Sequence, residues 1–343
     1  MTYYVGLDVG LRSSSVCIID GQGAIRLVRD VPSEIEPIAA CVRSVDGEVA
    51  GLGLETGNLT PWLAAGLRAE GFRVVVMEAR QVKTTLSSMR NKTDRNDARG
   101  IAQILRTGWY REVHVKSLES QRLKTLLAAR KALLRRRIDL ENGVRGLLKV
   151  YGIKLPPQIY HARFDELARQ AMAAESALAE ALDPLLEARG HLYRAFLDID
   201  RRVKALAHAD PVAQLLMSAP GVGYIAALTF KAAIDDPARF RRSKTVAAHF
   251  GLTPRRYQSG ERDNPGRISK AGDGEVRSAL FLAANTIMNG RGKSSPLRSF
   301  GARLSRSKGR KRAIVAVARK LAVVLHTMWT DGTMYCNEKE ELA

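Results

Sequence analysis

The sequence feature that most constrains the fold is the apolar run Phe72–Met77, which only Arg73 interrupts. A strand without polar alternation has to be buried on both faces, as in parallel sheets that carry helices on either side. The preceding segments fit such a sheet. Val49–Leu54 is typical of a strand, and Pro61–Glu70 is typical of a helix that begins at a proline and ends before Gly71. This part of the chain therefore predicts an α/β domain.

Three short β-type runs precede that part: Tyr3–Val9, Ser14–Ile19 and Ala24–Val28. The four residues 20–23 between the second and third runs include two glycines, which is typical of a tight hairpin turn. We therefore expect an α/β domain over residues 1–115 that begins with hairpins and continues with strands and crossover helices.

The next part, residues 116–210, has the pattern of long helices. Apolar residues recur at helical spacing with basic residues among them. The apolar residues are Leu123, Leu126, Leu127, Leu133, Leu134, Ile138, Leu147 and Leu148, and the basic ones are Arg130, Lys131, Arg135, Arg136 and Arg137. Pro156-Pro157 is expected to end this helix, and another helical stretch begins near Phe164. The pattern predicts a helical hairpin or coiled coil, whose charges either form a solvated face or serve nucleic-acid binding, and which could also dimerise.

Positive charge dominates the chain, with 55 Lys and Arg against 35 Asp and Glu and a formal charge of +20. Such an excess predicts a polyanionic partner, most simply DNA or RNA. No Asp or Glu occurs between Val276 and Thr330, so a strongly positive surface is expected there. The three cysteines form no CxxC pair and the histidines no HxxxH spacing. The cysteine pattern excludes a disulfide scaffold and a Cys zinc site, and the histidine pattern argues against a His-based metal site. The last residues, 336–343, are a polar tail.

Residues 211–335 predict a mainly α-helical domain with one notable turn. Two apolar helical segments, Gln214–Ala219 and Tyr224–Ala233, flank a turn that contains Gly221 and Gly223. The arrangement resembles a helix-hairpin-helix module, in which glycine backbone N–H groups bind a DNA phosphate. A plain turn between two helices is the alternative.

Four carboxylates stand out in three segments of the first domain. Asp8 follows a strand within Gly6-Leu7-Asp8-Val9-Gly10, a pattern found both in RNase H-like nucleases and in actin-like kinases. Glu55 ends another strand, and Asp94 and Asp97 lie on one face of a helix that Thr93 caps. A turn aspartate, a helix cap and favourable placement at a helix dipole are the alternative interpretations.

Together these four acids have the chemistry of a metal site. Ligand sets made only of carboxylate oxygen select Mg²⁺ or Mn²⁺ rather than zinc. Two such ions about 4 Å apart can activate a nucleophile and stabilise the leaving oxygen of a phosphodiester. The sequence therefore predicts a cluster for cutting nucleic acid, formed by Asp8, Glu55, Asp94 and Asp97.

A polar, Gly-rich and basic stretch over residues 251–273 holds a further candidate. Ser259 precedes Gly260 and has Arg255, Arg256 and Arg267 near it in the sequence. The serine could be a nucleophile whose target phosphate is held by the arginines. An ordinary basic loop is the alternative.

In this order and spacing, the motifs resemble those of IS110 family transposases, the IS116/IS110/IS902 group, across essentially the full length. In the N-terminal part the motifs are Gly6-Leu7-Asp8-Val9-Gly10, Leu54-Glu55-Thr56-Gly57 and Lys92-Thr93-Asp94-Arg95-Asn96-Asp97-Ala98. In the C-terminal part they are Pro220-Gly221-Val222-Gly223, Ala247-Ala248-His249-Phe250-Gly251-Leu252-Thr253-Pro254, Tyr257-Gln258-Ser259-Gly260-Glu261 and Ile268-Ser269-Lys270-Ala271-Gly272-Asp273.

The resemblance implies an RNase H-like (RuvC-like) fold for residues 1–115, with Asp8, Glu55, Asp94 and Asp97 as its DEDD set and Mg²⁺ (or Mn²⁺) as the cofactor. It implies that Ser259 attacks a DNA phosphate and forms a transient phosphoserine link. Contacts to nucleic acid are expected from glycines and basic residues of the C-terminal part. These are Gly221, Gly223, Arg255, Arg256, Arg267, Lys270, Arg303, Arg306, Lys308, Arg310, Lys311 and Arg312.

Partners follow from the same resemblance. Family members use a bridge RNA that base-pairs with donor and target DNA, so sequence choice would be delegated to RNA. They act as tetramers, so a homo-oligomer (dimer to tetramer) is expected, with residues 118–209 as the assembly element. No membrane partner is expected, because the apolar stretch Ile314–Leu325 is interrupted by Arg319-Lys320 and is too short to span a bilayer. The expected location is the bacterial cytoplasm, on the nucleoid when DNA is bound.

Three other functions remain as alternatives. A RuvC-like structure-specific endonuclease or junction resolvase would use the acids with water as nucleophile and would not need Ser259. An actin-like kinase would require a second Asp-Gly-Gly-type phosphate loop, which the sequence lacks. A non-catalytic RNA-binding protein would leave the four acids unexplained, because pooling like charges without a metal is costly.

Overall fold

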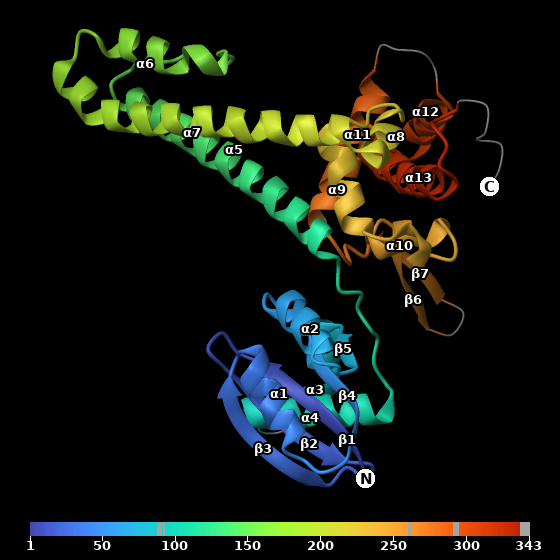
Figure 1. Cartoon of the computed structure of the whole chain (residues 1–343). Coiled ribbons are helices and arrows are strands. Elements are labelled where there is room, and N and C mark those ends of the chain that lie inside the picture. Colours follow the sequence, from blue (N-terminus) through green and yellow to red (C-terminus); the bar gives the residue numbers. More distant parts are fainter. Residues whose placement is uncertain (88–90, 92, 260–261, 291–294, 337–343) are drawn as a thin grey trace. The chain divides into compact units, whose positions relative to one another are not determined.

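The computed structural model describes residues 1–343 except 88–90, 92, 260–261, 291–294 and 337–343 (Figure 1). The chain forms two compact units, Met1–Lys116 and Ser117–Ala343. A further division of the second unit at residue 210, and a separate tail, stay predictions.

The first unit is a mixed sheet with helices. In chain order its elements are β1 (Thr2–Val9), β2 (Ser13–Asp20), β3 (Ile25–Pro32), α1 (Ile35–Arg43), β4 (Glu48–Glu55), α2 (Thr60–Ala69), β5 (Val74–Met77), α3 (Ala79–Leu86) and α4 (Asp94–Thr107). The strand order is β3-β2-β1-β4-β5. β2 is antiparallel to its neighbours β1 and β3, β4 is parallel to β1, and β5 is parallel to β4. This architecture is consistent with an RNase H-like domain, and it confirms the predicted α/β class.

Helices cover both faces of this sheet, because alternate residues of each strand point to opposite sides. Val5 and Leu7 of β1 are buried with residues of α1 and α2. On the other face, Cys17 of β2 packs with Ala98 and Ala102 of α4. Both faces of β5 are therefore buried, as its apolar run predicts, although the strand is shorter than that run by two residues.

The second unit is mostly helical. Its elements are α5 (Leu118–Val150), a 3-10 turn (His161–Arg163), α6 (Phe164–Met172), α7 (Ser176–Ala209), α8 (Pro211–Met217), α9 (Tyr224–Ile234), a 3-10 turn (Pro237–Arg239), α10 (Lys244–His249), β6 (Pro254–Ser259), β7 (Arg262–Ile268), α11 (Gly274–Asn289), α12 (Pro296–Lys308) and α13 (Arg310–Asp331). Two long helices, α5 and α7, lie against each other and carry α6 near their far end (Figure 1).

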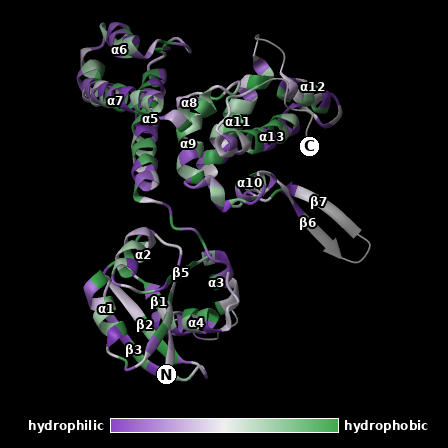
Figure 2. Ribbon diagram, turned by 45° about the vertical axis from the view of Figure 1, so that its right-hand side comes forward, coloured by the Kyte–Doolittle hydropathy of each residue, from purple (hydrophilic) through white to green (hydrophobic). Residues whose placement is uncertain are grey.

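The predicted end of the first long helix is wrong in position. α5 ends at Val150, before the proline pair, because Tyr151 closes the last turn and Gly152 takes a left-handed φ of +73°. Conversely, Pro184 lies inside α7 without ending it. Hydrophobic and hydrophilic residues are interspersed along α5 (Figure 2).

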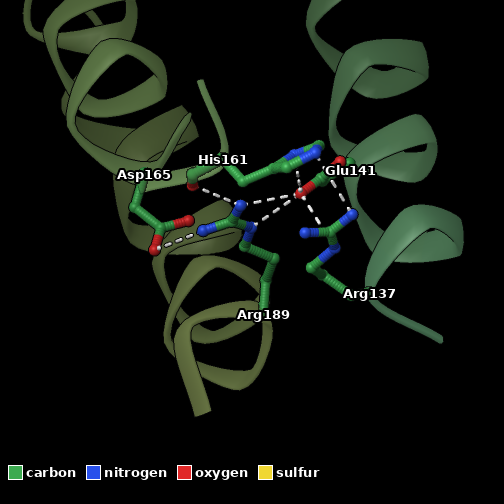
Figure 3. A network of polar contacts seen from close by, with 5 residues as sticks. All are labelled: Arg137, Glu141, His161, Asp165 and Arg189. Atoms are coloured by element: carbon green, nitrogen blue, oxygen red, sulfur yellow. Dashed lines mark hydrogen bonds and ion pairs between the residues drawn. The ribbon is translucent and has the colours of Figure 1, made fainter. Parts of the chain in front are cut away.

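A buried ionic network joins α5, α6 and α7 (Figure 3). The guanidinium of Arg189, 1% exposed, donates to Glu141 Oε1 at 2.7 Å and to Asp165 Oδ2 at 3.2 Å. It also lies over the rings of Phe164 and Tyr193, 5.2 and 5.0 Å from their centroids. Since each partner comes from a different part of the hairpin, the network fixes how α6 folds back onto the long helices.

The rest of the second unit has a helical core. Val317, Leu321 and Leu325 of α13 are fully buried in a cluster that also takes in residues of α8, α9, α10, α11 and α12. By length and composition α13 is the one described helix that could cross a membrane, but half of its apolar segment is buried inside the protein. Its apolar character is therefore that of a core helix.

Candidate active site and nucleic-acid interface

Asp8 and Glu55 lie at the ends of adjacent parallel strands. Leu7 of β1 is opposite Leu54 of β4, so the residues that follow them, Asp8 and Glu55, are neighbours across the sheet. Leu7 and Leu54 face α1 and α2. Because successive side chains alternate, Asp8 and Glu55 point to the α4 side. Both are half-buried.

α4 reaches this corner because β1 has a glycine there. A Cβ atom at Gly6 would lie 2.0 Å from the carbonyl oxygen of Ala98 and 2.4 Å from the backbone nitrogen of Ala102. Backbone can approach backbone so closely only where the side chain is a hydrogen atom. The contact sets the first turns of α4, including Asp97, against the end of β1.

The start of α4 is held in two ways. Thr93 caps it, as predicted, accepting a hydrogen bond from the backbone N–H of Asn96 at 3.2 Å. Arg95 pairs with Asp30 of β3 at 2.7 Å. The pKa of Asp30 lies below its usual value because Arg95 and Ser15 donate to its carboxylate. Sequence reasoning missed this pair, since no local pattern links residues 65 positions apart.

The four acids are thus brought to one corner by the backbone, but their side chains do not enclose a site. Asp94 is exposed and Asp97 half-buried. Within the described part of the chain, no three His, Cys, Asp or Glu side chains gather closely enough to hold a metal ion. The donor chemistry, oxygen alone, suits Mg²⁺ or Mn²⁺, whereas a closed coordination sphere is not preformed.

Ser259 is the last residue of β6, and its backbone pairs with Arg262 of β7. The polar, Gly-rich and basic stretch over residues 251–273 is therefore largely a β-hairpin, which the sequence did not reveal because its strands lack apolar alternation. The side chains of Arg256 and Ser259 lie outside the described residues. Arg255, Arg267 and Lys270 are exposed.

The foot of this hairpin is tightly fixed. Ser269 N donates to Thr253 O at 2.9 Å, and Lys270 N donates to Gly251 O at 3.1 Å. From α11, the guanidinium of Arg277 donates to Ala271 O at 2.5 Å and to two neighbouring carbonyls. The strand that leads to Ser259 therefore starts from a rigid base.

The two glycines of the helix-hairpin-helix-like turn differ in their surroundings. Gly221 has a φ of +74°, and a Cβ atom there would lie 2.6 Å from Ala283 O of α11. Backbone conformation and close packing against α11 therefore account for a glycine at position 221. Gly223 precedes α9 and has open space around its Cβ position. A phosphate-binding role for this turn stays a prediction.

The basic residues predicted at the C-terminal side share one junction. All six are exposed, and they flank Gly309 where α12 gives way to α13. They are Arg303, Arg306, Lys308, Arg310, Lys311 and Arg312. We call this set the basic junction. Its exposure suits contact with a polyanion.

These features define a class of protein: a basic, two-unit chain whose mixed sheet carries carboxylates at the ends of parallel strands, as expected of a nucleic-acid-processing enzyme. Comparison with known proteins narrows the class. Residues 213–299 match the family described as Transposase IS116/IS110/IS902 family, and residues 5–153 match a transposase family of the DEDD type named for IS110.

Relatives agree with both matches. The chain is 29% identical over 336 residues to the transposase for insertion sequence element IS1111A of Coxiella burnetii, covering 96% of this chain and 90% of that protein. It is 29% identical over 285 residues to a probable family 20 transposase of Pseudomonas aeruginosa, covering 81% and 83%. The transposase for IS1328 of Yersinia enterocolitica is 26% identical over 276 residues, covering 80% and 82%.

The chain belongs to the IS116/IS110/IS902 family of transposases. It is therefore an enzyme that cleaves and recombines DNA, and its DEDD-type domain implies a general dependence on divalent metal ions.

Proposed function

We propose that this transposase cleaves and exchanges DNA strands in a Mg²⁺-dependent reaction through a transient phosphoserine link, guided by a bridge RNA. The observation that carries the proposal is the corner where β1 and β4 end side by side against α4. It places Asp8 and Glu55 as neighbours on the α4 side, with Asp97 on the facing helix.

Asp8, Glu55, Asp94 and Asp97 would hold the metal. When bound, Mg²⁺ (or Mn²⁺) supplies positive charge for the phosphate that is being cut. Asp94 lies in the first turn of α4, three residues before Asp97, so the two carboxylates belong to the same side of that helix.

Ser259 would be the nucleophile. Its Oγ forms a bond to phosphorus while the bond between phosphorus and a deoxyribose oxygen breaks. The serine proton is released, and the leaving oxygen takes up a proton. Arg255, Arg256, Arg267 and Lys270 would hold the phosphate, since guanidinium and ammonium groups pair strongly with phosphate oxygens.

Donor DNA, target DNA and bridge RNA would share the positive surface. The basic junction and the turn at Gly221 and Gly223 would contact phosphates, while base pairing to the RNA chooses the sequence. The α5–α7 hairpin would mediate assembly into a homo-oligomer, from dimer to tetramer. The protein would act in the bacterial cytoplasm.

The test is recombination in vitro between donor and target DNA, with purified protein, Mg²⁺ and RNA transcribed from the flank of the element. We expect recombinant product in the complete mixture and none without the RNA or with Asp8→Asn. Asp46→Asn, which changes an exposed carboxylate before β4, is the matched control and should recombine normally. Equal product without RNA would contradict guidance, and full activity of Asp8→Asn would contradict the role of the acids.

A further inference from the structure

Trp109 exposes a large aromatic surface. It follows α4 directly after Gly108, which ends the helix with a left-handed φ of +70°, and it is 68% exposed. Single exposed apolar residues are ordinary in folded proteins. Two features distinguish Trp109: its backbone is held by hydrogen bonds, and the segment that follows it pairs with the sheet.

The side-chain amide of Gln81 holds the backbone on both sides of Tyr110. Its Nε2 donates to Trp109 O at 3.2 Å, and its Oε1 accepts from the backbone N–H of Arg111 at 2.6 Å. The segment is also paired with the strand beside it, since Val113 N donates to Val76 O at 2.7 Å. The indole is therefore displayed from an ordered support, which lowers the entropic cost of stacking a ligand on it.

Strand register places Glu112, three residues after Trp109, at the edge of the sheet where β4 ends with Glu55. Glu55 of β4 is opposite Met77 of β5 in parallel register, and Met77 is bridged to Glu112 in antiparallel orientation. Because this pairing is antiparallel and Met77 is the last residue of β5, the residues before Glu112 lie beyond the end of β5. That is the same edge of the sheet at which β4 ends with Glu55 and β1 nears its end at Asp8.

Exposed cations surround this edge on α3 and after α4. Arg80 and Lys83 of α3 are exposed, and the Arg111 side chain is 79% exposed. Glu78 lies 3.6 Å from Arg111 and offsets part of its charge. An aromatic face among cations is the combination that binds single-stranded nucleic acid, because bases stack on the ring while phosphates meet the charges.

We propose that Trp109 is a stacking platform for an unpaired nucleobase of a strand that lies across the carboxylate edge. The proposal rests on the proposed function, in which this edge cuts DNA. Bases within a duplex already stack on one another, so the platform selects an unwound DNA strand or an unpaired segment of the RNA. Either source supplies the same chemistry, a planar base next to a phosphate.

The experiment measures binding of fluorescein-labelled single-stranded DNA, single-stranded RNA and duplex DNA by anisotropy, using the full chain in Mg²⁺-free buffer across a salt series. Trp109→Ala removes the ring, and Trp109→Phe keeps a smaller one. The matched control is Trp62→Ala, which removes a tryptophan that is 45% exposed on α2, on the opposite face of the sheet.

We expect Trp109→Ala to weaken single-strand binding on the order of tenfold, with duplex binding and the salt slope unchanged, because no charge is lost. Trp109→Phe should recover most of the affinity, and Trp62→Ala should bind as the original does. The single-stranded probe with the larger loss identifies the source. Far-ultraviolet circular dichroism should show all variants equally folded.

Two results would overturn the platform: single-strand binding of Trp109→Ala that equals the original, or a loss in Trp109→Phe as large as in Trp109→Ala. A change in oligomer size on gel filtration with Trp109→Ala would instead assign the indole to a contact between copies of the chain. This assay measures binding without metal, so its result does not depend on strand exchange. Failure of the proposed function would appear in the recombination assay and not in this one.

Discussion

Gly6 of β1 and Ala98 of α4 meet backbone to backbone: a Cβ atom on Gly6 would lie 2.0 Å from the carbonyl oxygen of Ala98. This contact decides how close the acids of α4 come to Asp8, two residues further along β1. A requirement for glycine in the middle of a buried strand is thus part of how the candidate site is built.

Gly6→Ala should therefore displace α4. The added methyl group meets backbone atoms that cannot rotate away, and overpacking of this kind costs about 1–3 kcal/mol. Urea unfolding should show that loss, and strand cleavage should fall with it. Gly21→Ala is the control, because its Cβ position has open space. Equal stability of the two variants would mean that α4 does not pack on β1 as described.

Neutralising a single carboxylate at the corner should stop cleavage but leave DNA binding intact. Asp97→Asn keeps the shape of the side chain and removes the charge that a metal ligand supplies. Chelation by EDTA should have the same effect on the unmodified protein. Added Mg²⁺ should restore cleavage by the unmodified protein but not by Asp97→Asn. Gel-shift and cleavage assays on the same samples check this, and metal-restored cutting by Asp97→Asn would argue against the role of this carboxylate.

Removal of the Arg189 guanidinium should destabilise the far end of the α5–α7 hairpin. Arg189→Met leaves the buried Glu141 and the half-buried Asp165 without their main partner, and a broken buried pair costs about 3–5 kcal/mol. Hydrogen exchange should show the loss in α6 first, since α6 is joined to the hairpin through Asp165. Arg194→Met, an exposed position on the same helix, serves as the control. Unchanged hydrogen exchange in α6 would mean that the network does not hold α6 on the long helices.

Charge removal at the basic junction should weaken binding in a salt-dependent way. Replacing Arg306, Arg310 and Arg312 with Gln removes three charges, and each lost phosphate contact lowers the slope of log affinity against log salt by about 0.9 on duplex DNA. The same change at Arg194, Arg201 and Arg202, exposed on α7, is the control. An unaltered slope for the junction variant would place DNA elsewhere.

Much of the first unit could be predicted because its signals are local. The apolar run before α3 reports burial on both faces, and Thr93 with the stripe of α4 reports a capped amphipathic helix. The β6–β7 hairpin was missed because the charged and polar residues in its sequence leave no apolar periodicity to detect. Contacts such as Gln81 with Trp109 join residues 28 positions apart, so only the folded chain brings them together.

The phosphoserine mechanism is tested most directly by a denaturing gel of end-labelled DNA incubated with the protein, Mg²⁺ and the RNA. We expect a protein–DNA adduct with the unmodified chain and none with Ser259→Ala or Asp8→Asn. Ser278→Ala, an exposed serine on α11 whose hydroxyl donates to Gly274 O at 3.0 Å, should still form the adduct. Metal-dependent cutting by Ser259→Ala without any adduct would contradict the phosphoserine mechanism and make the protein a nuclease that uses water.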